Sequence, residues 1–151
     1  MLFRSKEYLY FRHQSFQEYL AAEYIAKEPE KLMDILDDSL NPKWKNVLMF
    51  LAGQPERGNE IVERILSKED AHHRNIFLSA ELFPEVIGVK SCLKEKLLDI
   101  LYSLVYDKKN PFRYIVIQNM IHVDREIAMR EIEVLLHSDD DDEVINGIWI
   151  A

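Results

Sequence analysis

The chain has 151 residues, 48% of them hydrophobic and 30% charged, a composition typical of a globular domain large enough to bury a core and unlike that of a disordered segment. Its 27 acidic and 19 basic residues give a net charge of −8, and no basic patch interrupts this acidity, which excludes nucleic acid and anionic membrane surfaces as expected partners. Four Gly and five Pro are few, which favours helices over a turn-rich β fold.

Neither a secretory signal nor a membrane-spanning segment is predicted. The first twenty residues carry charged and polar groups throughout, and no apolar run approaches the roughly 20 residues that cross a bilayer. The single cysteine, Cys92, excludes an internal disulfide and is expected to pack as a small apolar residue. We therefore expect a cytoplasmic protein.

The N-terminal segment predicts a strand followed by a capped helix. The aromatic-rich run 6–11 suits a short strand. Ser15 is the expected N-cap of a helix over 16–27, and Glu18 three positions later completes a capping box. The face expected to be buried consists of residues at helical spacing, namely Phe16, Tyr19, Leu20 and Tyr24.

Further helices follow at short intervals. Pro29 is expected early in a short helix that ends after Leu36, and Asn41-Pro42 starts a helix that Gly53 ends. The latter helix carries an apolar stripe of Trp44, Val47, Leu48, Leu51 and Ala52. After a turn over 54–58, a short helix is marked by Ile61, Val62, Ile65 and Leu66. Asp70 is the expected cap of the next, in which Ile76, Phe77, Ala80, Leu82 and Phe83 are apolar.

The second half of the chain predicts its longest helix over 91–106. Asn110-Pro111 repeats the earlier Asn-Pro start, and the helix behind it, over 112–122, is apolar on more than one face, as expected of a helix covered on two sides. Asp124 is expected to cap a partner helix. The acids at 139–143 suit the start of a last helix, over 144–150.

These helices form pairs that begin near positions 15, 42, 70, 111 and 141. The spacing of about 27 to 41 residues lies in the range of helical-repeat arrays, in which each pair buries the open face of its neighbour. The expected fold is therefore all-α, an irregular HEAT-like α-α superhelix with a short N-terminal strand remnant. The alternative is a compact helical bundle.

The sequence holds no recognisable catalytic constellation. A phosphate-binding G-x-x-x-x-G-K-[ST] loop, a G-x-S-x-G elbow and an H-E-x-x-H zinc motif are all absent. The five histidines do not pair at ligand spacing, and the acids at 139–143 fail the calcium-loop pattern because its Gly and final Glu positions are Val144 and Ile150. No metal site and no catalytic residue are expected. His13 is the one candidate site residue, and on the residues alone it is a local hydrogen-bonding group.

Two ordered motifs resemble a known family. Residues 11–22 match F-x-H-x-S-F-Q-E-Y-x-A-A at Phe11, His13, Ser15, Phe16, Gln17, Glu18, Tyr19, Ala21 and Ala22. Residues 44–53 match W-x-x-V-x-x-F-L-A-G. Both are similar to the junction of NACHT-type signal-transducing NTPases of the STAND group, where the winged-helix region ends and a helical sensor begins. Together they cover about the first third of the chain, and the rest agrees only in being helical.

The resemblance implies a division into a winged-helix remnant (1–28) and a HEAT-like repeat segment (29–151). It also implies that His13 contacts the β-phosphate of bound ADP when the ATPase module is present. The family's P-loop, its Mg²⁺-binding acids and most of its winged helix are missing from this sequence, and its last predicted helix is cut short. We therefore expect a fragment or a truncated reading frame that needs no cofactor itself, whereas the parent would use ATP, ADP and Mg²⁺.

The expected function is a non-catalytic sensor and scaffold. Its implied partners are the upstream NTPase module in cis and an unidentified ligand or protein. The resemblance further implies that packing of the segment in a closed state is autoinhibitory. It also implies a role in defence or stress signalling. Trp44, Leu48 and Leu51 are the expected packing anchors. One alternative is a freestanding helical interaction module. Another is an enzyme with an unrecognised site, which predicts a deep pocket of converging polar groups. Apolar repeat faces also make a homodimer possible.

Overall fold

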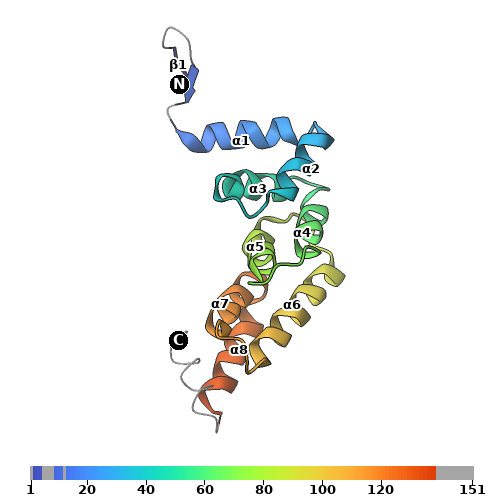
Figure 1. The fold of residues 1–151 in the computed structure, drawn as a ribbon, viewed down its shortest axis with the longest axis vertical. Helices are drawn as coiled ribbons and strands as arrows, with labels where there is room; N and C mark the ends of the chain where they lie inside the picture. The colour runs from blue at the N-terminus through green and yellow to red at the C-terminus, as the bar shows by residue number, and fades with distance from the viewer. Residues whose placement is uncertain (1, 5–8, 12, 139–151) are drawn as a thin grey trace.

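The computed structural model describes residues 2–4, 9–11 and 13–138, and in that part of the chain it is all-helical apart from one short hairpin (Figure 1). The predicted all-α class is therefore confirmed. The elements are β1 (Leu2–Arg4), β2 (Leu9–Phe11), α1 (Gln14–Ile25), α2 (Pro29–Asp37), the 3₁₀ helix η1 (Pro42–Trp44), α3 (Lys45–Ala52), α4 (Gly58–Leu66), α5 (Arg74–Leu82), the 3₁₀ helix η2 (Phe83–Glu85), α6 (Ser91–Tyr106), α7 (Arg113–Val123) and α8 (Arg125–Leu136).

The helices lie in two rows along the long axis of the molecule (Figure 1). In one row α1 packs on α3, α3 on α5 and α5 on α7, while in the other α2 packs on α4 and α4 on α6. Helices that follow one another in sequence join the rows, most extensively α6 with α7 and α7 with α8. The odd-numbered helices α1 to α7 thus stack on one another, as do the even-numbered helices α2 to α6, and α1 lies at one end of the stack.

A single hydrophobic core runs through the stack from α1 to α8. Leu48 and Leu51 of α3 are fully buried, as predicted for packing anchors. Trp44 is only partly buried, and its indole N–H donates to the Asp38 carboxylate at 3.0 Å. This hydrogen bond links η1 to the C-terminal end of α2, and the Trp44 side chain lies at the edge of the core.

Several predicted helix starts are confirmed by their caps. The Asn41 side chain accepts from the Lys43 N–H at the start of η1, and the Asp124 carboxylate accepts from the Ile127 N–H at the start of α8. The Lys94 ammonium lies 2.7 Å from the same Asp124 carboxylate. This hydrogen-bonded ammonium and the backbone donors lower the pKa of Asp124, so α8 is both capped and tied to α6 at one side chain.

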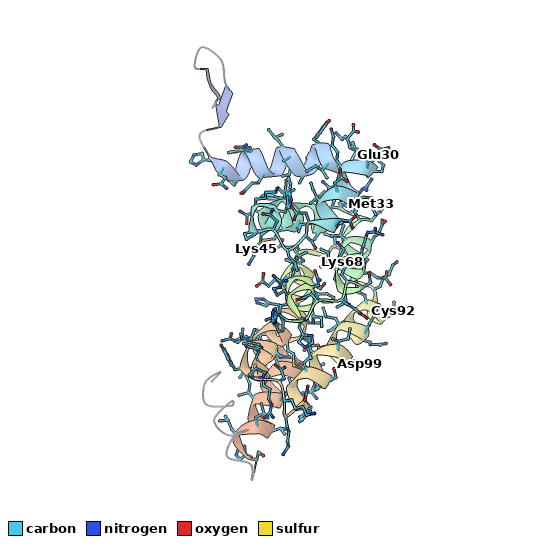
Figure 2. The ribbon with its side chains drawn as sticks, viewed as in Figure 1. Glu30, Met33, Lys45, Lys68, Cys92 and Asp99 are labelled. Atoms are coloured by element: carbon cyan, nitrogen blue, oxygen red, sulfur yellow. The ribbon has the colours of Figure 1, made fainter. Side chains whose placement is uncertain are left out.

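Other predictions need correction. The cap of α1 is His13, without a side-chain capping bond, and Ser15 lies inside the first turn. Glu18 forms no capping box, because its carboxylate accepts from the side-chain amides of Gln14 at 2.8 Å and Asn46 at 3.0 Å. Cys92 is exposed at the start of α6 and does not pack in the core (Figure 2). The predicted acid cluster at 139–143 and the helix over 144–150 lie outside the described residues.

Candidate docking surface on the first helix

Helix α1 has two apolar faces, and the structure buries the one that the sequence analysis did not choose. Ala22 is fully buried, and Ile25 and Ala26 are nearly so. On the opposite side Phe16, Leu20 and Tyr24 are 60%, 47% and 53% exposed. Tyr19 is 46% exposed. The prediction that Phe16, Tyr19, Leu20 and Tyr24 form the buried face is therefore wrong. We call Phe16, Leu20 and Tyr24, at i, i+4 and i+8, the outer ridge of α1.

Small side chains explain why the other face is buried. Ala22 and Ala26 allow the backbone of α1 to approach its neighbours closely, whereas the aromatic rings of the outer ridge would hold the helices apart. Two polar bonds fix this orientation, since Asn46 donates to Glu18 at 3.0 Å and Gln54 donates to Glu23 at 3.2 Å. The core face is thus selected by close packing together with cross-helix hydrogen bonds.

The tyrosines of α1 are held in place although they are exposed. The Tyr19 ring meets the Phe50 ring edge-on, with centroids 5.7 Å apart. The Lys31 ammonium lies 4.2 Å from the centroid of the Tyr24 ring and also donates to its hydroxyl, and that hydrogen bond is the main cause of the raised pKa of Lys31. The outer ridge is therefore a partly preformed surface, and preformed side chains cost less to order on binding.

The outer ridge lies at the end of the helix stack, where none of the helices in the described ranges covers it (Figure 1). Terminal helices of helical arrays normally present polar outer faces, and a contiguous exposed apolar patch marks an interaction site. The β1–β2 hairpin precedes α1, pairs antiparallel with Leu2 opposite Phe11, and contacts α1 through β2. A two-stranded hairpin alone is marginal in water. The hairpin therefore needs support from a neighbouring element, and it lies at the N-terminal end of α1.

His13 lies between the hairpin and α1, as the sequence predicted, and is exposed. Its ring centroid is 6.4 Å from that of Phe16, at the N-terminal end of the outer ridge. Within 2–4, 9–11 and 13–138, no three His, Cys, Asp or Glu side chains gather as a metal site would require. Because His13 is exposed, it is accessible to a partner that covers the outer ridge.

Sequence reasoning identified the ridge residues but assigned them to the core. The signal that separates the two faces was present, because Ala21, Ala22, Ile25 and Ala26 form a second apolar stripe on the same helix. A helix with apolar residues on two sides is covered on both when its assembly is complete. This makes the outer ridge the strongest candidate site in the described part of the chain.

Comparisons with protein-family models, with curated proteins and with solved structures find no match. Among the residues that the structure describes, no helix is both long enough and apolar enough to span a bilayer.

Proposed function

We propose that this chain is a non-catalytic docking and sensing segment of a NACHT-like signalling NTPase, built as a HEAT-like helical array. The observation that carries the proposal is the outer ridge of α1. Its residues Phe16, Leu20 and Tyr24 lie in and directly beside the motif that resembles the family junction, and they are exposed in this chain. In the proposed parent they pack against the NTPase module that precedes them.

The size of the surface favours a partner in the same polypeptide. A stable interface between separate proteins buries about 800 Å² on each side. The outer ridge consists of three side chains, and the hairpin that precedes it has two strands of three residues each. Such a small interface is weak between separate chains, but linkage raises the effective concentration to the millimolar range, so it suffices in cis. We therefore assign the upstream module as the partner of the ridge.

His13 has a defined part in this proposal. It is exposed where the chain passes from the hairpin into α1. A module that covers the outer ridge would therefore lie next to it. By resemblance, its ring would reach the β-phosphate of ADP bound to that module and hold the closed state. The array beyond α1 would bind a ligand or protein partner, and release of the ridge would permit nucleotide exchange and assembly in cytoplasmic defence or stress signalling.

The proposal predicts that the purified chain neither hydrolyses ATP nor binds ADP, because the groups that hold phosphates and Mg²⁺ belong to the proposed module. Phosphate release and calorimetric titration with Mg²⁺-ATP and Mg²⁺-ADP measure this. The His13→Ala variant should give the same null traces as the unmodified chain. Turnover that co-elutes with the protein and disappears in that variant would mean that the chain carries its own catalytic site.

A further inference from the structure

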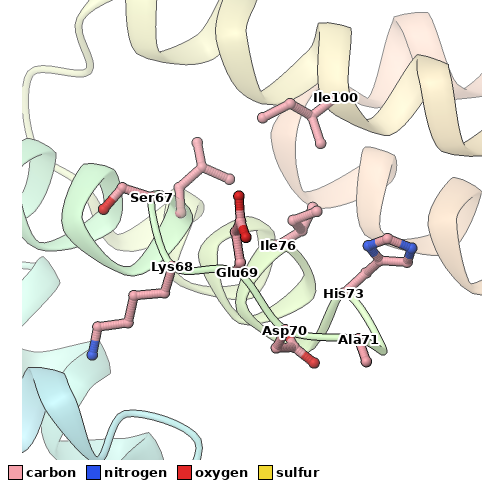
Figure 3. A pocket seen from close by; sticks show the side chains of 9 residues that line it. Ser67, Lys68, Glu69, Asp70, Ala71, His73, Ile76 and Ile100 are labelled. Carbon is pink, nitrogen blue, oxygen red and sulfur yellow. The ribbon is translucent and has the colours of Figure 1, made fainter.

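Two features away from the outer ridge have space or apolar surface for an occupant, a hollow beside α5 and one flank of α8. The hollow, of about 640 Å³, lies between the α4–α5 loop and α6, and Asp70 is part of its lining (Figure 3). The Asp70 carboxylate is already engaged, because it accepts from the backbone N–H groups of His72 and Asn75 and from the Arg74 side chain. Asp70 therefore orders the loop, and the flank of α8 is the stronger candidate.

Helix α8 carries more apolar surface than its neighbours bury. Its buried apolar side chains are Ala128, Ile132 and Leu135. Four further apolar side chains are partly buried or exposed, namely Ile127, Met129, Val134 and Leu136. A helix with so broad an apolar stripe is covered more widely when its assembly is complete. Because α8 is the last helix in the described ranges and lies at the end of the stack opposite α1, no later described helix provides that cover (Figure 1).

The uncovered apolar residues of α8 divide between two flanks. Glu131 marks the flank next to α6, because its carboxylate accepts from the Tyr106 hydroxyl. Around the helix axis Val134 lies about 60° from Glu131, whereas Met129 and Leu136 lie roughly 150° from it on the other side. We call Met129 and Leu136 the free flank of α8. The free flank is turned away from α6, and Met129 is 45% exposed on it.

The sequence that follows α8 matches the free flank in character and in length. Residues 139–151 lie outside the described ranges, and their apolar members Val144, Ile145, Ile148 and Trp149 recur at helical spacing. A helix over 144–150 is about 10 Å long, which is also the length of α8 between Met129 and Leu136. The residues 137–143 between the two helices make a connection of ordinary length for packed helices.

We propose that residues 144–150 form a helix that runs back along α8 and covers its free flank, with Trp149 packed on Met129. A methionine sulfur beside an indole ring is a favourable contact. The acids at 139–143 then precede the new helix, where its dipole favours negative charge. A contact of this size suffices because both partners belong to one chain, which raises their effective concentration. The proposal is independent of the role assigned to the outer ridge.

The test is acrylamide quenching of Trp149 fluorescence in a Trp44→Phe variant, in which Trp149 is the only tryptophan. We expect emission at shorter wavelength and a quenching constant at least about threefold smaller than for a free peptide of residues 139–151, because a packed indole is shielded from solvent. In the unmodified chain, a nuclear Overhauser effect between the Trp149 ring and the Met129 methyl group reports the same contact without a substitution. Quenching as in the free peptide, or protection that appears only at high protein concentration and so comes from a second copy, would overturn the proposal.

Two variants of α8 locate the contact. Met129→Glu places a charge on the free flank and should raise the quenching constant of Trp149 to near that of the free peptide. Val134→Glu is the matched control, because it places the same charge on the flank next to α6, where Val134 is 55% exposed, and it should leave the quenching constant unchanged. If Trp149 stays protected in Met129→Glu while circular dichroism shows an intact fold, residues 144–150 do not cover the free flank.

Discussion

Gly58→Ala is expected to cost about 3 kcal/mol or more of the free energy of unfolding, enough to prevent stable folding of a marginal domain. A Cβ at residue 58 would lie 2.2 Å from the Ala52 carbonyl oxygen and 3.0 Å from Val86 Cγ1. The nearer atom belongs to the backbone at the end of α3, so no side-chain rotation relieves the clash. The end of α3 and the start of α4 would therefore have to move apart.

Gly53→Ala is the matched control, because it introduces the same methyl group at the C-cap of α3, in the same connection between α3 and α4. The nearest atoms to a Cβ at residue 53 are backbone oxygens at 3.6 to 3.7 Å, and its φ of −74° is one that alanine adopts readily. Its stability should therefore change by less than about 1 kcal/mol, with a small gain possible from the stiffer unfolded chain. Urea unfolding followed by circular dichroism compares the two, and equal midpoints would contradict the packing described between α3 and α4.

Leu51→Ala is expected to cost about 2–5 kcal/mol, because Leu51 is fully buried in α3 and its removal leaves a cavity between packed helices. The same substitution at Leu20 should cost less than about 1 kcal/mol, because that side chain is 47% exposed on the outer ridge and alanine is the better helix former. Denaturant unfolding of both variants measures the difference. A Leu20→Ala cost similar to that of Leu51→Ala would show that the ridge is buried in the isolated chain.

Local sequence signals predicted much of the fold. The bounds of α6, Ser91–Tyr106, follow from an uninterrupted apolar stripe between two polar ends. Asn41 and Asp124 mark helix starts because their side chains accept backbone N–H groups within three residues, an interaction that sequence spacing alone determines. The sequence also predicted Asp70 as the N-cap of α5, which is wrong, because His73 occupies that position without a side-chain capping bond. The Asp70 carboxylate nevertheless accepts from the N–H groups of His72 and of Asn75 in the first turn of α5.

Features that depend on distant partners were not predictable in the same way. The orientation of α1 is decided by Asn46 and Gln54, which lie 28 and 31 residues from their acidic partners. Gly58 looks like an ordinary turn residue until α3 is placed against it. The end of α2 and the loop before α5 line one surface hollow, and only tertiary packing brings these two segments together. In each case the missing information was a contact between elements, not a local preference.

The role assigned to the outer ridge is tested by hydrogen exchange across Gln14–Ile25, measured in the isolated chain and in the proposed parent protein, in which an NTPase module precedes it. We expect the α1 amides to be slowed at least about tenfold in the longer protein, and a Phe16→Ser, Leu20→Ser, Tyr24→Ser variant to lose that protection while the amides of α6 stay unchanged. Equal exchange of α1 in both proteins would contradict the assignment of the ridge as a docking surface.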